Sequence, residues 1–192
     1  MEKISESMAW LARPDGDVVI GHGPFTPVAE PPADGIAFYV RSFGPGTTLP
    51  WQIPQRTERT TLAEFSSRFA GEPPADCAWH PLDAGPFSTV FQEVTAAIRG
   101  GLFEKTVPVV AEKGTGGHDI GRSLVASLTR HRSPLRSYGF FDGRRGFAGA
   151  TPELLFSLSG KTLETMALAG TAKREDREVF AVDEKEIREH EY

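Results

Sequence analysis

Hydrophobic and polar positions in the first third of the chain alternate over short stretches only. Residues 17–20 and 36–41 are brief apolar runs between prolines and glycines, a pattern typical of short strands joined by turns. Residues 62–69 carry apolar side chains at helical spacing and predict one short helix. The first third is therefore expected to be rich in strands and turns.

Longer periods begin near residue 87. Six apolar residues share one face of a helix over residues 87–98, and the two glycines that follow end it. Residues 103–110 then alternate as a strand, in which Pro108 cannot donate a ladder hydrogen bond and so favours an edge or a bulge. Residues 120–130 predict another helix.

Two turn dipeptides predict hairpins further along the chain. They are Asp142-Gly143, which joins residues 137–141 to 146–150, and Ser159-Gly160, which joins residues 154–158 to 162–168. A charge-rich helix is expected to begin near residue 175. The pattern as a whole predicts a mixed α+β fold built on hairpins rather than on regular βαβ units.

A connector rich in proline and glycine, residues 71–86, separates two parts of the chain. We expect a strand-rich region over residues 1–85 and the first part of a catalytic domain over residues 86–192. The chain has 192 residues, of which 39% are hydrophobic, so it is long enough and apolar enough for a packed core.

Charge and hydropathy exclude several classes of protein. The net charge of −5 argues against a nucleic-acid partner, and no apolar run is long enough to span a membrane. The amino terminus lacks the order of a signal peptide, and a single cysteine, Cys77, cannot form an internal disulfide. The cytoplasm is therefore the expected compartment.

Residues 116–123 have the spacing of a phosphate-binding loop. Arg122 stands where such a loop needs a lysine, and a guanidinium does not replace a compact ammonium. Asp142 would be the accompanying magnesium ligand, but it falls at a predicted hairpin turn. We therefore favour a glycine-rich surface loop over a nucleotide site.

Lys105 and Glu153 each allow a structural and a catalytic interpretation. Lys105 shares a face of its predicted strand with Val107 and Val109, where it either guards a sheet edge or acts as a base from a partly apolar pocket. Glu153 follows Pro152 and is either a turn carboxylate or a positioned general acid. For Lys105 alone, the structural interpretation is the more common one.

Two further stretches carry groups suited to binding. Residues 167–171 are small, and their backbone N–H groups either cradle an anion or form a plain turn. In the predicted helix near the end, Glu186, Glu189 and His190 share one face, and carboxylates suit magnesium. The more usual explanation of that helix is a solvated charged surface.

Three blocks in order, residues 147–155, 163–171 and 183–191, resemble the chorismate-utilising enzymes. This family includes isochorismate synthases, salicylate synthases and the large subunits of anthranilate and aminodeoxychorismate synthases. The resemblance runs from about Phe87 to the carboxyl end. It implies the fold of anthranilate synthase component I, in which antiparallel sheets are flanked by helices.

Two positions narrow the implied activity. Family members that add water resemble this chain in having a lysine at the position of Lys105, whereas ammonia-adding anthranilate enzymes usually have glutamine. Aminodeoxychorismate synthases typically carry a lysine where this chain has Ala169. The resemblance therefore implies an isochorismate synthase first and a salicylate synthase second, serving menaquinone, siderophore or salicylate production.

The resemblance also implies roles. Glu153 would protonate the departing C4 hydroxyl of chorismate, and Lys105 would take the proton of the water that attacks C2. Glu189 would hold a Mg²⁺ ion that binds the ring carboxylate. The backbone of three residues would seat a substrate carboxylate: Ala169, Gly170 and Thr171.

The resemblance stops inside the family's catalytic domain, and Tyr192 falls within a predicted helix. We therefore expect this chain to hold the first half of that domain and to be inactive alone. It would need the other half as a partner or self-associate through exposed strand edges. The alternative of another class is a non-catalytic remnant that serves as a binding or assembly module.

Overall fold

The computed structural model describes residues 7–42, 44, 46–74, 76–116, 120–130 and 134–167, and four single residues: Lys173, Glu175, Glu184 and Ile187. The helix predicted from about residue 175 lies outside the described residues, except that Glu184 and Ile187 are helical. No helix in the described part of the chain is long and apolar enough to cross a membrane.

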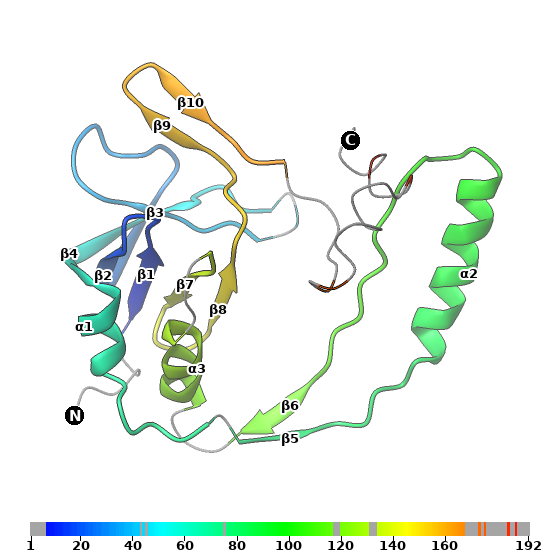
Figure 1. The fold of residues 1–192 in the computed structure, drawn as a ribbon, viewed down its shortest axis with the longest axis horizontal. Coiled ribbons are helices and arrows are strands. Elements are labelled where there is room, and N and C mark those ends of the chain that lie inside the picture. The colour runs from blue at the N-terminus through cyan, green and yellow to red at the C-terminus, as the bar shows by residue number, and fades with distance from the viewer. Residues whose placement is uncertain are drawn as a thin grey trace.

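The fold is mixed α and β, as the sequence predicts, and its main body is a curled antiparallel sheet (Figure 1). The order of its six strands is β3-β4-β2-β1-β7-β8. Their bounds are β1 Met8–Ala12, β2 Asp17–Val28, β3 Phe38–Tyr39, β4 Trp51–Thr61, β7 Arg136–Phe141 and β8 Gly146–Thr151. Two helices, α1 (Leu62–Ser67) and α3 (Ile120–Thr129), cover one face of this sheet.

Strand β1 lies at the centre of the sheet, although the sequence pattern did not predict it. It pairs with β2 on one side and with β7 on the other, so that Trp10 stands opposite both Ile20 and Gly139. The sheet therefore joins strands from both sides of residue 85. A domain boundary at that position stays a prediction.

The core lies between the sheet and the two helices. Trp10 is 1% exposed, and its ring centroid lies 6.0 Å from the rings of Phe65 and Phe141. A Cβ at Gly139 would fall 2.1 Å from the Trp10 ring, so only glycine allows this close approach. Val125 of α3 completes the cluster from the helix side.

Helix α1 begins with a reciprocal cap. The Thr61 side chain accepts a hydrogen bond from the Glu64 backbone N–H at 3.2 Å, and the Glu64 carboxylate accepts one from the Thr61 N–H at 3.1 Å. Two N–H groups that a helix start leaves unpaired are thereby satisfied. The helix predicted over residues 62–69 is confirmed.

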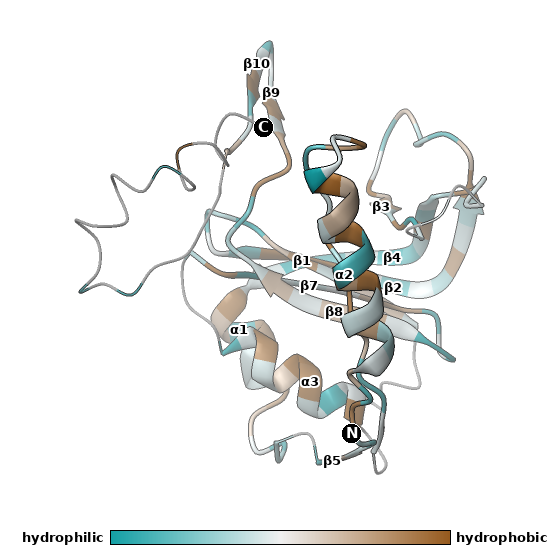
Figure 2. Cartoon of the chain, turned by 90° about the vertical axis from the view of Figure 1, so that its right-hand side faces the viewer, coloured by the Kyte–Doolittle hydropathy of each residue, from teal (hydrophilic) through white to brown (hydrophobic). Residues whose placement is uncertain are grey.

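Residues 77–116 form an arm that leaves the sheet (Figure 1). In this arm β5 (Cys77–Trp79) pairs with β6 (Gly114–Gly116), and α2 (Gly85–Arg99) lies between them in sequence. Helix α2 confirms the helix predicted over residues 87–98. None of its residues is buried, and hydrophobic positions alternate with hydrophilic ones along it (Figure 2).

The strand predicted over residues 103–110 is wrong, because this segment has no strand partner. Val107 is 73% exposed and Val109 is 81% exposed, so the alternation does not reflect a buried face. Pro108 also lacks the N–H that a ladder needs. The strand that pairs with β5 is β6, at Gly114–Gly116, which lies beyond this segment.

Both predicted hairpins are present. Strands β7 and β8 have the predicted register, and their turn contains Gly143 at φ +91°. Strands β9 (Ser157–Ser159) and β10 (Thr162–Glu164) are shorter than predicted, with three residue pairs between them. Beyond them a hydrogen bond from the Thr165 hydroxyl to the Leu155 carbonyl, 2.9 Å long, replaces the ladder.

Candidate functional site

The face of the sheet opposite α1 and α3 carries an aromatic hollow of about 470 Å³. Leu11 of β1 pairs with Val19 of β2 on one side and with Tyr138 of β7 on the other, so the three side chains share this face. Phe140 and Phe147 lie beside them, with ring centroids 6.4 Å apart. The sequence analysis did not predict this hollow.

Glu153 lies just beyond the end of β8. Its backbone N–H donates to the Thr151 Oγ1 at 3.1 Å, and its side chain is exposed. Thr151 is the last residue of β8 and stands opposite Arg136, the first residue of β7. The predicted general acid is therefore fixed at one end of the β7–β8 hairpin.

Arg136 has an unusual environment. Its Nη1 atom is buried and has no hydrogen-bond partner among the described residues. On the same strand, Ser137 and Gly139 are buried against Trp10, whose Nε1 donates to the Ser137 hydroxyl at 3.4 Å. Because side chains alternate along a strand, Arg136 extends from the opposite face of the sheet.

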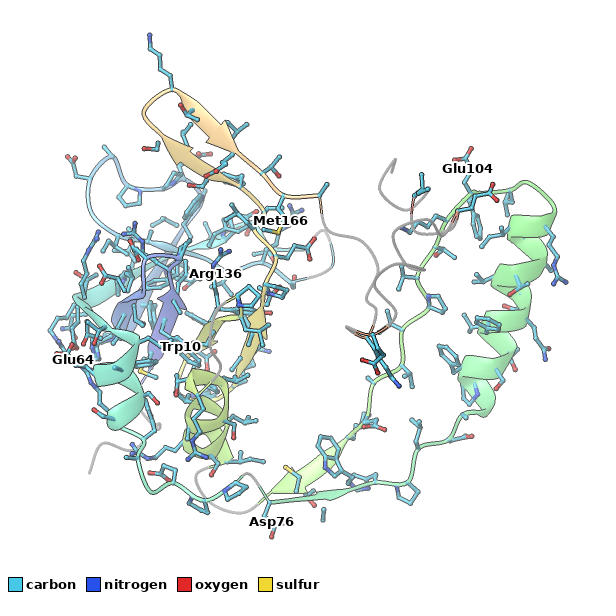
Figure 3. All side chains as sticks on the ribbon, viewed as in Figure 1. Trp10, Glu64, Asp76, Glu104, Arg136 and Met166 are labelled. Carbon is cyan, nitrogen blue, oxygen red and sulfur yellow. The ribbon has the colours of Figure 1, made fainter. Side chains whose placement is uncertain are left out.

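Lys105 lies on the arm, in the segment between α2 and β6, and is exposed. Figure 3 labels its sequence neighbour, Glu104, on the arm rather than on the sheet. Because residues 103–110 form no strand, the predicted common face with Val107 and Val109 does not exist. The role of Lys105 as a base stays a prediction.

Lys105 and Glu153 share none of three hollows formed by the described residues. Neither of them lines the aromatic hollow, a second hollow on the arm, or a third near His22 and Arg56. The pairing of acid and base predicted from the sequence is therefore not visible in this arrangement.

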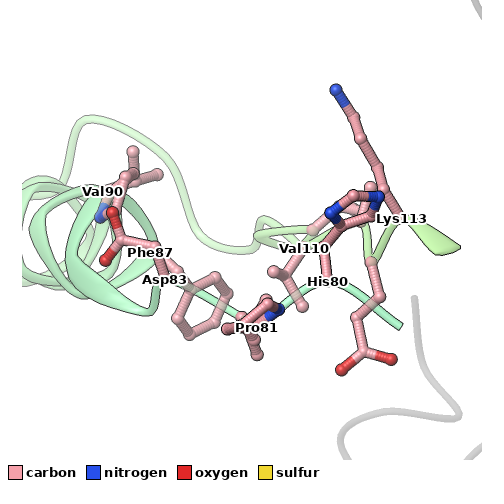
Figure 4. A pocket seen from close by; sticks show the side chains of 12 residues that line it. His80, Pro81, Asp83, Phe87, Val90, Val110 and Lys113 are labelled. Atoms are coloured by element: carbon pink, nitrogen blue, oxygen red, sulfur yellow. The ribbon is translucent and has the colours of Figure 1, made fainter. Parts of the chain in front are cut away.

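The hollow on the arm has a volume of about 410 Å³ and lies between the start of α2 and the segment before β6 (Figure 4). His80 and Lys113 meet there because the His80 backbone N–H donates to the Lys113 carbonyl at 2.8 Å. Phe87 and Val90 supply its apolar wall. Two carboxylates, Asp83 and Glu112, also line this hollow.

Strong electrostatic effects occur at two carboxylates that line none of these three hollows, Glu58 and Asp142. A hydrogen bond from Arg68 lowers the pKa of Glu58 to about 2, and His22 Nε2 lies 3.2 Å from the same carboxylate. The backbone N–H groups of Arg145 and Arg144 lower the pKa of Asp142. Glu58 lies on β4 and Asp142 in the β7–β8 turn.

Of residues 116–123, positions 117–119 lie outside the described residues, and Arg122 lies in helix α3. Arg122 Nε donates to Glu72 Oε1 at 2.6 Å, and its guanidinium carbon lies 5.2 Å from the centroid of the Phe69 ring. Asp142 Oδ1 accepts the two turn N–H groups at 2.8 and 2.9 Å. Arg122 and Asp142 therefore both make structural contacts within the fold.

The remaining predicted site residues lie outside the described residues: Ala169, Gly170, Thr171 and Glu189. Within the described ranges, no group of three or more His, Cys, Asp or Glu side chains is placed to hold a metal ion. The predicted magnesium site and the predicted carboxylate-seating backbone are therefore untested.

A family model described as chorismate binding enzyme matches residues 53–192, which is more than half of the chain. The chain belongs to this family. No curated protein and no solved structure matches it. In this chorismate-binding enzyme the match begins at residue 53, within β4. The sequence blocks had indicated a later start, near Phe87.

The matched span includes α1, the arm and the β7–β8 hairpin, and with them Lys105, Arg136 and Glu153. Of these three, sequence reasoning singled out the lysine and the glutamate but not the arginine. The predicted hairpin could have indicated the arginine, because side chains alternate along a strand and Arg136 therefore shares a face with Tyr138 and Phe140. Its lack of a partner is visible only in the folded chain.

Proposed function

We propose that this chorismate-binding enzyme is an isochorismate synthase, which moves the ring hydroxyl of chorismate from C4 to C2. The observation that carries the proposal is the family match over a span that contains both Lys105 and Glu153. Lys105 supports water addition over ammonia addition, and Ala169 supports it over aminodeoxychorismate synthesis.

Glu153 acts as the general acid in this proposal. Hydroxide is a poor leaving group, so the C4 oxygen must receive a proton as its bond to carbon breaks. The Thr151 hydroxyl holds the Glu153 backbone and limits the positions that the carboxyl group can reach. The exposed side chain is accessible to a substrate at this end of the hairpin.

Lys105 acts as the general base and takes a proton from the water that adds to C2. An amine accepts a proton only when it is neutral, which requires a neighbourhood that disfavours its charge. Lys105 is exposed on the arm, and Glu153 is exposed at the sheet. Turnover therefore requires a conformation in which both groups enclose the substrate.

Glu189 is proposed to hold Mg²⁺, and the backbone of Ala169, Gly170 and Thr171 to seat a carboxylate. Magnesium would supply positive charge to the ring carboxylate of the substrate. None of these residues is described, and the described residues contain no ligand cluster. The roles of Glu153 and Lys105 are therefore argued without any step through the ion.

The test is to incubate the protein with chorismate and Mg²⁺ and to identify the products by chromatography. We expect isochorismate, and we expect Lys105→Ala and Glu153→Gln each to lower turnover by about 10²- to 10⁴-fold. The matched controls are Lys161→Ala and Glu164→Gln in the β9–β10 hairpin, which should leave turnover unchanged. Full turnover in both site variants would contradict the assigned roles.

The same assay separates two other functions. Salicylate and pyruvate as products would identify a salicylate synthase, which the family match supports equally. Chorismate that binds but is not converted would identify a binding or assembly module. Lys105 and Glu153 are both exposed and line none of the three hollows described above, and this observation favours the second alternative.

A further inference from the structure

One nitrogen of the Arg136 guanidinium, Nη1, is buried and has no hydrogen-bond partner among the described residues, although the residue as a whole is half-buried. This nitrogen is out of contact with solvent, and it donates no hydrogen bond to any of the described residues. Leaving a buried charged donor unpaired is costly, and buried arginines are as a rule paired. Such an atom indicates a binding group whose partner is an anion from outside the fold.

Strand alternation places the Arg136 side chain on the face of the sheet opposite α1 and α3. Ser137 and Gly139 point toward Trp10 and the helices, so Arg136 extends to the other side with Tyr138 and Phe140. Tyr138 and Phe140 line the aromatic hollow of about 470 Å³. Arg136 precedes Tyr138 by two residues and lies on the same face of β7, just beyond the residues that line the hollow.

The register places Arg136 opposite Thr151, the residue whose hydroxyl holds the Glu153 backbone. Arg136 and Thr151 stand directly opposite each other in the β7–β8 ladder, so their side chains share one face, about 5 Å apart at Cβ. The Thr151 hydroxyl on that face holds the Glu153 N–H at 3.1 Å. Neither Arg136 nor Glu153 forms an ion pair within the described part of the chain.

We propose that Arg136 binds a carboxylate of the cyclic substrate and holds its ring between Glu153 and the aromatic hollow. The identity of the substrate as chorismate rests on the proposed function. A guanidinium can take both oxygens of a carboxylate at once, which fixes orientation as well as position. The carboxylate supplies the hydrogen-bond partner that Nη1 lacks, and the attached ring lies beside the acid that must reach it.

Arg59 is another cation near this face, and it suits the role less well. It lines the hollow from β4 and is exposed. Strand β4 is separated from β7 by β2 and β1, a distance of about 14 Å at the usual spacing of strands. A carboxylate at Arg59 would leave the ring far from Glu153, whereas a carboxylate at Arg136 would not.

Chorismate binding to variants, measured by calorimetry, tests the proposal. We expect Arg136→Met to raise the Kd by about 10- to 100-fold, because a charge-assisted pair is lost. Arg136→Lys should give an intermediate Kd, because it keeps the charge and loses the planar fork. The matched control is Arg145→Met, at the turn of the same hairpin and 91% exposed, which should change the Kd by less than about twofold.

Thermal unfolding without ligand distinguishes a ligand-binding role from a structural one. Because Nη1 has no hydrogen-bond partner among the described residues, Arg136→Met should not lower Tm, and Arg136→Lys should not lower it either. An unchanged Kd in Arg136→Met would overturn the proposal, as would an equal loss in Arg145→Met. A fall in Tm of more than about 5 °C would also overturn it, because the guanidinium would then be held by the protein itself.

The products that the wild-type protein forms from chorismate test the proposed function independently of the role of Arg136. Chorismate binding that depends on Arg136 without formation of isochorismate would support the inference and contradict the proposed function. Formation of isochorismate with an unchanged Kd in Arg136→Met would do the reverse. A wild-type protein that does not bind chorismate would overturn both.

Discussion

Two regions of the molecule differ in how far they bury their large apolar side chains. One is the sheet with α1 and α3, and the other is the arm. Trp10 in the sheet is 1% exposed, whereas Trp79 in the arm is 63% exposed. Helix α3 has four buried residues, and the longer helix α2 has none. Because burial of apolar surface is the main favourable contribution to folding, the sheet region carries most of the stability and the arm adds little.

This difference bears directly on the proposed chemistry. Glu153 and Arg136 belong to the β7–β8 hairpin, which is anchored in the stable sheet. Lys105 belongs to the arm, which has few contacts of its own. The proposed acid and carboxylate-binding group are thus held by the sheet, and the position of the proposed base depends on the arm.

The largest expected effect comes from exchanging the two tryptophans for alanine. Trp10→Ala removes a ring that packs on Phe65 and Phe141 and leaves a cavity, so we expect the free energy of unfolding to fall by about 3–5 kcal/mol. Trp79→Ala is the matched control in the arm and should cost less than about 1 kcal/mol. Chemical denaturation measures both, and similar losses would show that the arm is as well packed as the sheet.

The sequence predicts well those elements that are determined by neighbouring residues. The helices α1, α2 and α3 and the β7–β8 hairpin follow from local spacing, a cap or a turn dipeptide. Strand β1 was missed, because its identity as a strand depends on β2 and β7, and β7 begins more than 120 residues later. The strand at 103–110 was predicted wrongly for the same reason, since alternation says nothing about whether a partner is present.

The candidate site was predictable only in part. Glu153 and Lys105 stand out through the family's sequence blocks, and Thr151 shows how the fold positions the glutamate. The aromatic hollow and the unpartnered Arg136 arise from strands distant in sequence, so no local pattern reveals them. Whether Lys105 faces Glu153 depends on the conformation of the arm, which local sequence does not determine.

A smaller effect is expected from the helix starts of the two regions. Thr61→Ala removes the hydroxyl that accepts the Glu64 N–H in the α1 cap and should lower the free energy of unfolding by about 1 kcal/mol. Thr89→Ala is the matched control, because Thr89 lies in α2 and its hydroxyl bonds only to the Gly85 carbonyl. That variant should be neutral in urea denaturation. Equal losses would show that α2 contributes to the cooperative unit.

The smallest expected effect is a pH dependence located in the sheet region. The pKa of Glu58 is lowered to about 2, first by the hydrogen bond from Arg68, so the carboxylate is favoured in the folded state. A lowered pKa adds stability that is complete above the ordinary value of 4.5 and is lost as the pH falls from there toward about 2. Because Arg68 is 37% exposed, solvent screening limits the contribution to about 1 kcal/mol at neutral pH.

Glu58→Gln should therefore be less stable than the wild-type protein at about pH 7, and the difference should shrink as the pH approaches about 3. Glu104→Gln is the control, because Glu104 lies on the arm and forms no ion pair within the described residues. Its stability should follow the wild-type curve at every pH. A difference for Glu58→Gln that persists undiminished in acid would assign the loss to packing of the side chain and not to its charge.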